Sequence, residues 1–140
     1  MIEIKNLSGG YQKTLIIKDL TLTIEKGNFY ALIGPNGSGK TTLIKLITGV
    51  LPNQGGTITL FDKPLHSYST IERAKILGVL SQEAKVEFDF RVEEIVMLGR
   101  YPHQKGFLKH ISYQDRPLVD NVMKQTDVFR FRKKPFKWLS

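Results

Sequence analysis

The chain has 140 residues, and its content of 41% hydrophobic and 24% charged residues is ordinary for a soluble globular protein. This length fits one domain or part of one. Cysteine is absent, which excludes a disulfide framework and a cysteine metal site and fits a reducing cytoplasm. Residues 1–5 do not begin a signal peptide, and no apolar stretch approaches the roughly 20 residues of a membrane helix. We therefore expect any membrane association to go through a partner protein.

The net charge of +8 is unevenly distributed, because many basic residues fall late in the chain. Such a run can bind nucleic acid or an anionic membrane surface, or it can be a solvated surface or the complement of acidic residues further on. No single-strand platform or recognition motif accompanies the run, so we expect no nucleic-acid partner. The run consists of Arg130, Arg132, Lys133, Lys134 and Lys137.

Five segments have the pattern of β-strands. Residues 2–7, 20–24 and 57–60 alternate apolar with polar side chains, which predicts half-buried, antiparallel strands. Residues 29–33 are apolar throughout, which predicts a strand covered on both faces. Residues 76–81 form a second short apolar segment, predicted as a further strand.

Helical spacing follows the apolar segment at 29–33 and returns late in the chain. Apolar residues within 41–50 fall at i, i+3, i+4 and i+7, and Gly49 and Pro52 close the segment. After Asp89 the chain becomes helical, with the apolar residues of 92–96 on one face. A later helix is expected to begin near Pro117, since proline is favoured in a first helical turn.

Between the strand expected at 29–33 and the helix expected at 41–50 lies a complete phosphate-loop motif, G-x-x-x-x-G-K-[ST]. Its glycines let backbone N–H groups curl around a phosphate, and the helix N-terminus adds the positive end of its dipole. Lys40 is expected to reach the outer phosphates, and the Thr41 hydroxyl to ligate Mg²⁺. The residues expected to bind a nucleoside triphosphate are Gly34, Pro35, Asn36, Gly37, Ser38, Gly39, Lys40, Thr41 and Thr42.

Four features in this order resemble the ATPase subunit of an ATP-binding cassette (ABC) transporter, and the resemblance spans essentially the whole chain. Tyr11 is similar to the aromatic residue that precedes the phosphate loop and stacks on adenine, and residues 34–42 have the loop form that this family favours. Gln82 is similar to the Q-loop glutamine, which senses Mg²⁺ and the attacking water. Residues 92–103 resemble the helical-subdomain segment of importers for iron–siderophore complexes, haem and cobalamin.

The resemblance implies an α/β P-loop NTPase fold of the ABC ATPase type, with an antiparallel β portion and a partial helical subdomain. Residues 1–88 would form the first part of the nucleotide-binding core, and residues 89–140 the partial helical subdomain. It implies ATP and Mg²⁺ as cofactors, Lys40 and Gln82 as catalytic residues, and Thr41 and Gln82 at the metal. The implied partners are a membrane-spanning permease and a second ATPase subunit, which would hold the protein at the inner face of the cell membrane.

The segment Leu139-Ser140 resembles the start of the family's signature motif, so we expect a fragment truncated there. No apolar strand in the chain ends in the aspartate–glutamate pair that hydrolysis requires in this family. We therefore expect ATP binding with little or no turnover. Leu7-Ser8-Gly9-Gly10 also spells the signature, but it precedes Tyr11 and we do not expect it to act as one.

Several interpretations stay open at this point. Arg100, Tyr101 and His103 would either shape the surface that meets a membrane subunit or form a solvated helix end. Arg91 stands where the family has a small hydroxyl residue, which leaves the local helix cap open. The alternative functions are a non-catalytic nucleotide-binding or interaction protein and, less favoured, a small P-loop kinase, which would need a later acidic strand end.

Overall fold

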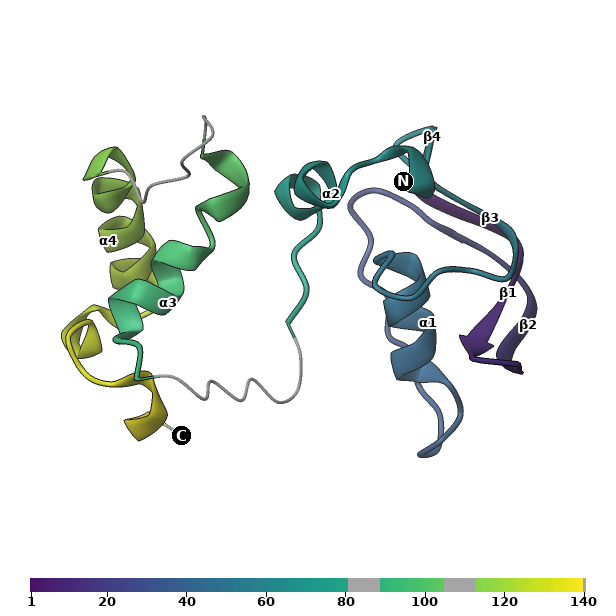
Figure 1. Cartoon of the computed structure of the whole chain (residues 1–140), viewed down its shortest axis with the longest axis horizontal. Helices are drawn as coiled ribbons and strands as arrows, with labels where there is room; N and C mark the ends of the chain where they lie inside the picture. The colour runs from purple at the N-terminus through teal and green to yellow at the C-terminus, as the bar shows by residue number, and fades with distance from the viewer. Residues whose placement is uncertain (81–88, 105–112, 140) are drawn as a thin grey trace. The chain divides into compact units, whose positions relative to one another are not determined.

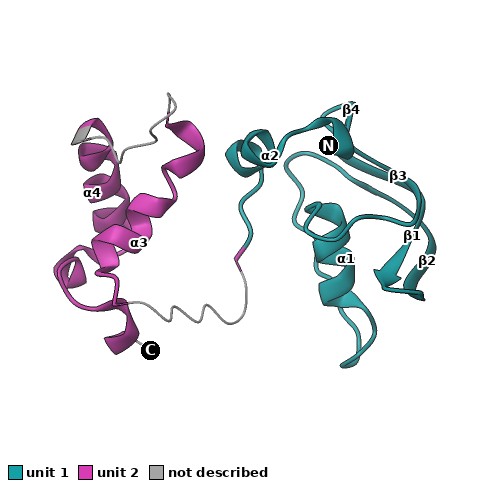
Figure 2. Cartoon of the chain, viewed as in Figure 1, with its two compact units in different colours: residues 1–79 teal, residues 80–140 magenta. Residues whose placement is uncertain are grey.

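The computed structural model describes residues 1–80, 89–104 and 113–139. The chain divides into two compact units, Met1–Val79 and Leu80–Ser140 (Figure 2). Each unit has a hydrophobic cluster made of its own residues.

Unit 1 is built on a four-stranded antiparallel sheet with the strand order β2-β1-β3-β4 (Figure 1). The strands are β1 (Ile2–Tyr11), β2 (Thr14–Ile24), β3 (Gly55–Leu60) and β4 (Lys63–Pro64). The first three confirm the strands predicted from alternation, and each is longer than predicted because ladder pairing extends beyond the alternating residues. The pair of β1 and β2 forms a long hairpin whose closing residues are Tyr11 and Thr14.

The helix α1 (Lys40–Ile47) confirms the predicted helix and packs its apolar face against the sheet. Leu46 is almost completely buried, at 1% exposure. It meets β1 at Gly9, where an added Cβ would lie 2.6 Å from Leu46 Cδ2. Burying a leucine side chain contributes roughly 1.5–3 kcal/mol, so this contact anchors the hairpin on the helix. The core cluster contains Ile4, Leu7, Leu43, Leu46, Ile47, Ile58, Leu60 and Leu65.

Both strands of the hairpin are bent by irregular residues. Asn6 and Asp19 have φ values of 49° each, in the left-handed region, and the register of the pair shifts beside them. The Asn6 side-chain amide donates to Asp19 Oδ1 at 2.8 Å, and the Asp19 N–H donates to Ser8 Oγ at 3.0 Å. Bulges of this kind bend a strand and increase its twist. In β1, Asn6 lies between two residues that pair with β3, Lys5 and Ser8.

The strand predicted at residues 29–33 is wrong, because the structure has no regular element there. Phe29 is 95% exposed and Ile33 is 90% exposed. A strand buried on both faces needs neighbouring strands and covering helices. Within the described part of the chain, the strands form the antiparallel sheet alone, and none of them pairs with this segment.

The strand predicted at residues 76–81 is also wrong for the residues that the structure describes. Ile76 ends the helix α2 (Thr70–Ile76), and residues 77–80 have no regular structure. The helix begins with a capping box: Ser69 Oγ accepts from the Glu72 N–H at 3.2 Å, and Glu72 Oε2 accepts from the Ser69 N–H at 2.7 Å. A 3-10 helix at Leu65–Ser67 precedes it.

Unit 2 contains two helices, α3 (Val92–Leu98) and α4 (Arg116–Gln125), which confirm the helices predicted there. They pack around Val92, Val119 and Met123. The described residues of unit 2 also form 3-10 helices at Tyr101–His103, Tyr113–Asp115, Phe129–Phe131 and Phe136–Trp138. In the described ranges, no helix has the length and apolarity that crossing a bilayer requires.

Ion pairs tie the ends of the unit 2 helices together. Arg100 Nε lies 2.8 Å from Asp115 Oδ1, with both side chains largely buried. Arg116 Nη2 lies 3.2 Å from Glu93 Oε2. At the start of α3, the Arg91 N–H donates to Glu94 Oε2 at 2.7 Å. Glu94, the third residue of α3, therefore accepts a hydrogen bond from the backbone at the helix start. Because Glu94 provides this capping bond, Arg91 can occupy the N-cap position.

Candidate functional site

The phosphate-loop residues lead directly into α1. Gly37 and Gly39 have φ values of 81° and 91°, a left-handed conformation that side chains with a Cβ rarely adopt. Gly39 is the N-cap of α1, and its carbonyl accepts the first helical bond, from the Leu43 N–H at 2.8 Å. The N–H groups of residues 40–42 precede that bond and have no helical acceptor. They form the positive end of the helix dipole, and the first turn contains no acidic residue to oppose an anion.

Lys40 lies at this helix start with its ammonium turned back onto the loop. Its Nζ donates to the carbonyl oxygens of Gly34 and Pro35, each at 2.7 Å. The loop is further closed by the Ser38 N–H, which donates to Pro35 O at 3.3 Å. A positive charge and a set of backbone N–H groups are therefore gathered within one short turn.

A cavity of about 270 Å³ opens beside this loop. It combines polar groups of the loop with apolar residues of the hairpin and of the segment before the loop. The residues of 29–33 that failed to form a strand contribute Leu32 and Ile33 to its wall. The lining residues are Ile17, Leu32, Ile33, Gly34, Pro35, Ser38, Gly39, Lys40 and Leu43.

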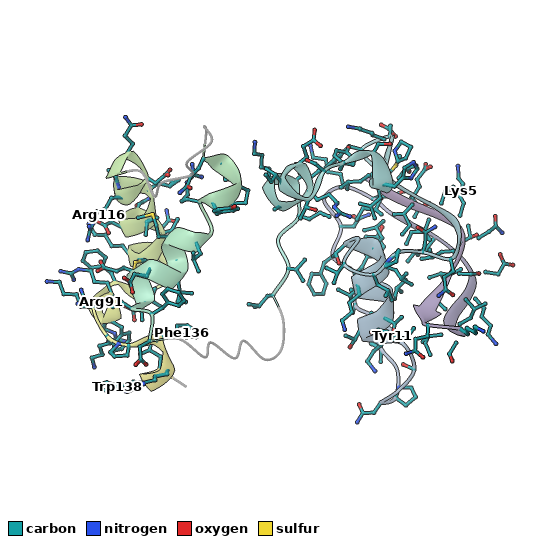
Figure 3. The ribbon with its side chains drawn as sticks, viewed as in Figure 1. Lys5, Tyr11, Arg91, Arg116, Phe136 and Trp138 are labelled. Atoms are coloured by element: carbon teal, nitrogen blue, oxygen red, sulfur yellow. The ribbon has the colours of Figure 1, made fainter. Side chains whose placement is uncertain are left out.

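Tyr11, predicted to stack on a base, lies at the closing end of the hairpin beside α1 (Figure 3). Its side chain is 44% exposed. Lys45 of α1 donates from Nζ to Tyr11 Oη at 3.2 Å. This bond lowers the pKa of the Tyr11 hydroxyl, and a hydrogen bond with the Thr42 side chain lowers it further. The structure thus brings Tyr11 to the same helix that begins at Lys40.

The remaining predicted residues divide between described and undescribed parts of the chain. Thr41 is exposed in the first turn of α1, whereas Thr42 is buried. Gln82 lies outside the described residues. Among the described residues, no group of three or more histidine, aspartate or glutamate side chains is arranged to hold a metal ion.

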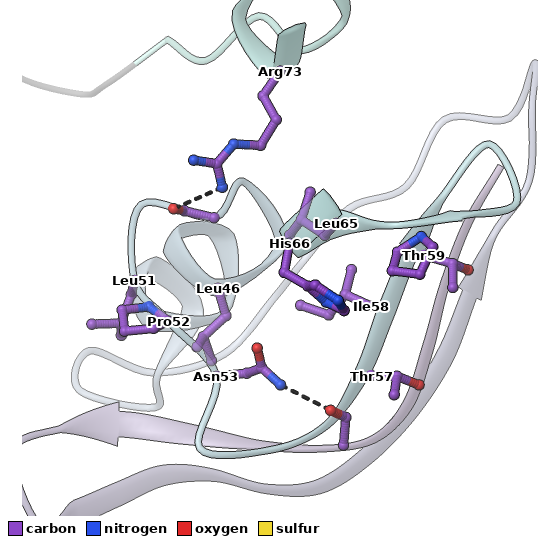
Figure 4. A pocket seen from close by; sticks show the side chains of 13 residues that line it. Leu46, Leu51, Pro52, Asn53, Thr57, Ile58, Thr59, Leu65, His66 and Arg73 are labelled. Carbon is purple, nitrogen blue, oxygen red and sulfur yellow. Dashed lines mark hydrogen bonds between the residues drawn. The ribbon is translucent and has the colours of Figure 1, made fainter. Parts of the chain in front are cut away.

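A larger cavity, of about 360 Å³, lies at the other end of α1 and contains none of the predicted site residues (Figure 4). Arg73 closes the helix end there, because its Nη1 donates to Gly49 O at 3.1 Å. A cation at a helix C-terminus is favourable to the helix dipole. Asn53 Nδ2 similarly donates to Gly56 O at 2.8 Å. The smaller cavity is the better candidate site, because it is lined by Lys40 and other residues of the phosphate loop.

Two details of the site were outside what the sequence predicted. Lys45 was not identified as a site residue, because its contact with Tyr11 joins residues far apart in the chain. The signature-like tetrapeptide Leu7–Gly10 lies within β1, where Leu7 is buried in the core and Gly9 permits the close approach of α1. Its glycines therefore have a packing explanation.

Solved structures with the same fold place the chain among ATP-binding cassettes. The ATP-binding subunit of an ABC transporter matches with a TM-score of 0.68 and 26% identity, over 96% of this chain and 54% of that one. A nucleotide-free ATP-binding cassette matches in fold with a TM-score of 0.78 and 20% identity, over 100% of this chain and 59% of the other. The predicted α/β P-loop fold of the ABC ATPase type is confirmed.

Curated relatives of the chain are likewise named as ATP-binding proteins. The chain is 44% identical over 136 residues to the uncharacterized ABC transporter ATP-binding protein YvrA of Bacillus subtilis (strain 168), covering 97% of this chain and 31% of YvrA. It is 33% identical to the iron(3+)-hydroxamate import ATP-binding protein FhuC of the same organism, covering 97% and 50%. It is 39% identical to the hemin import ATP-binding protein HmuV of Escherichia coli O157:H7, covering 86% and 47%.

The chain therefore spans half or less of the length of these relatives. The model of the family described as ABC transporter matches residues 17–140, which include the phosphate loop and all of unit 2. Because this match covers most of the sequence, the chain belongs to the ABC transporter family.

Proposed function

We propose that this chain binds Mg-ATP at the loop of residues 34–42, as the nucleotide-binding part of an ABC transporter ATPase subunit. The observation that carries the proposal is the loop itself: two left-handed glycines lead into α1, and the Lys40 ammonium lies against the loop carbonyls. Free N–H groups at a helix start and a nearby lysine are the elements of a triphosphate site. The adjoining cavity offers room beside them.

Each side chain would have a defined task. Lys40 would exchange its bonds to Gly34 O and Pro35 O for the outer phosphates. Thr41, exposed in the first turn of α1, would ligate Mg²⁺ together with phosphate oxygens and water, since magnesium sites in nucleotide-binding proteins use few protein ligands. Tyr11 would stack on adenine. Gln82 would act at the metal and the attacking water, by resemblance to the family.

Hydrolysis by the 140-residue chain alone is proposed to be slow or absent. Its sequence has no apolar strand ending in an aspartate–glutamate pair, and a general base is typically worth about 10²–10⁴ in rate. Positioning and charge stabilisation would remain, because phosphoryl transfer depends mainly on these. Steady-state phosphate release should stay at background. Turnover that disappears with Lys40→Ala would contradict this part of the proposal.

In the full-length subunit, we propose that ATP binding and hydrolysis energise import of an iron chelate, haem or cobalamin. The names of FhuC and HmuV, which are iron(3+)-hydroxamate and hemin import proteins, support an iron-containing cargo. The proposed partners are a membrane-spanning permease and a second ATPase subunit. The protein would then lie in the cytoplasm, held at the inner face of the membrane by the permease.

Thermal unfolding tests the binding proposal directly. A ligand at about 100 times its Kd stabilises the folded state by about 2.7 kcal/mol, so saturating Mg-ATP should raise the Tm of the wild-type chain. Lys40→Ala should remove most of this shift; it also removes the two bonds from Lys40 Nζ to Gly34 O and Pro35 O, so the shift is measured for each variant against its own Tm without nucleotide. An equal Tm with and without Mg-ATP in the wild type would overturn the proposal.

A further inference from the structure

Lys45 and Tyr11 form a contact that the phosphate-loop motif does not explain. Lys45 Nζ lies 3.2 Å from Tyr11 Oη and 5.5 Å from the centroid of the ring. The ammonium therefore approaches the hydroxyl end of the tyrosine and leaves ring surface open to solvent, consistent with the partial exposure of the side chain. Within the described part of the chain, no carboxylate lies within ion-pair distance of Lys45.

The surroundings fix both partners of this contact. Lys45 belongs to α1, whose next residue, Leu46, is buried against Gly9 of β1. Tyr11 follows two residues later in the same strand. An added Cβ at position 9 would lie 2.6 Å from Leu46 Cδ2, so the buried Leu46 side chain or the hairpin would have to shift. The close approach at Gly9 therefore keeps the strand that carries Tyr11 near the helix that carries Lys45.

We propose that Lys45 is a positioning residue for nucleotide binding: it holds the Tyr11 ring in one orientation beside α1, ready to stack on the base. This inference rests on the proposed function. An unrestrained aromatic side chain at a hairpin end would lose rotamer freedom when a base stacked on it. Ordering it beforehand removes that cost and should strengthen ATP binding by about threefold to tenfold.

The structure also distinguishes this role from a direct phosphate contact. Lys45 lies more than a helical turn beyond Lys40, and its ammonium already bonds to the phenol oxygen. The contribution of Lys45 to binding affinity should therefore depend on the presence of a base in the ligand. A contact to phosphate would instead serve every triphosphate equally.

The experiment compares Mg-ATP with magnesium tripolyphosphate, which has the phosphates and lacks the base, by titration calorimetry on the 140-residue chain. Lys45→Met keeps an unbranched side chain one atom shorter than lysine and removes the donor. It should weaken ATP binding about threefold to tenfold and leave tripolyphosphate binding unchanged. Lys45→Arg, which keeps a donor and the charge, should retain most of the ATP affinity.

Tyr11→Phe supplies a second, independent variant, because it removes the acceptor and keeps an aromatic ring. It should weaken ATP binding to a similar extent, and adding Lys45→Met to it should cause no further loss, since the two changes remove the same bond. Equal weakening of both ligands by Lys45→Met, or no weakening of ATP binding by either variant, would overturn the inference alone. A wild-type chain that binds neither ligand would overturn the proposed function with it.

Discussion

Lys40 shows how a single residue can be ready for its ligand. Its two acceptors, the carbonyl oxygens of Gly34 and Pro35, are neutral. An anionic phosphate oxygen adds the attraction between opposite charges, which a neutral carbonyl oxygen does not offer to the ammonium. A triphosphate offers such oxygens, so exchange of partners favours the bound state while the lysine stays satisfied without it.

The pKa of the Tyr11 hydroxyl depends on the contacts of that side chain, so it can be used to test them. The Lys45 ammonium, and then the Thr42 side chain, lower the pKa of its hydroxyl below the ordinary value of about 10. A lowered pKa means that the charged phenolate form is favoured in the folded state, so this stabilisation is present above pH 10 and is lost as the pH falls through the lowered pKa. In an ultraviolet titration, the difference between the wild type and Tyr11→Phe should have its midpoint below 10.

Lys45→Met should move that midpoint upward, since it removes the larger of the two causes. A midpoint unchanged by this substitution would mean that the ammonium does not interact with the hydroxyl in solution.

The sequence predicted Tyr11 and the loop because local order and spacing define them. It could not predict Lys45, whose role depends on a tertiary approach between β1 and α1.

At the scale of elements, the sequence predicted the apolar or polar character of a segment better than it predicted which strands or helices lie beside that segment. The run Phe29–Ile33 is apolar, and that property alone suggested a covered strand. Strand formation also needs pairing partners, and the described sheet offers none to this segment. The helix α2 was missed although its start carried a visible signal, serine at 69 followed by glutamate at 72. The apolar residues within 76–81 predicted a strand, and a strand pattern of this length does not exclude a helix that ends at Ile76.

The capping box of α2 makes a prediction at this scale. Ser69→Ala removes the acceptor of the Glu72 N–H, and loss of such a cap costs about 1 kcal/mol. The Glu72 amide should therefore exchange its hydrogen about fivefold faster at constant pH, as measured by nuclear magnetic resonance. Ser69→Asp, which restores an acceptor, should return the slow rate. An unchanged rate in Ser69→Ala would show that the cap does not stabilise the helix.

For the whole molecule, the decisive feature is that the two hydrophobic clusters share no residue. Leu46 is central to the cluster of unit 1, and Met123 to that of unit 2; both are almost fully buried. The fold class followed from the sequence because the phosphate loop and the alternating strands are local patterns. The predicted division into residues 1–88 and 89–140 stays a prediction, because residues 81–88 lie outside the described residues.

Separate clusters predict separate responses to core truncation. Leu46→Ala should destabilise unit 1 by about 2–5 kcal/mol, as large-to-small core changes do. Hydrogen exchange measured by mass spectrometry should then rise in peptides of residues 1–79 and stay unchanged in those of residues 89–139. Met123→Ala is the matched control and should give the opposite pattern. Increased exchange throughout the chain in either variant would contradict two independent cores.

The central claim is that the loop of residues 34–42 binds a triphosphate, and calorimetric titration of the 140-residue chain with Mg-ATP tests it most directly. The wild type should show saturable heat with one site. Lys40→Ala should weaken binding by about tenfold to a hundredfold, since a hydrogen bond to a charged group contributes roughly 1.5–3 kcal/mol. A folded wild-type chain that gives no heat of binding, or a Lys40→Ala variant with the same Kd as the wild type, would contradict the account.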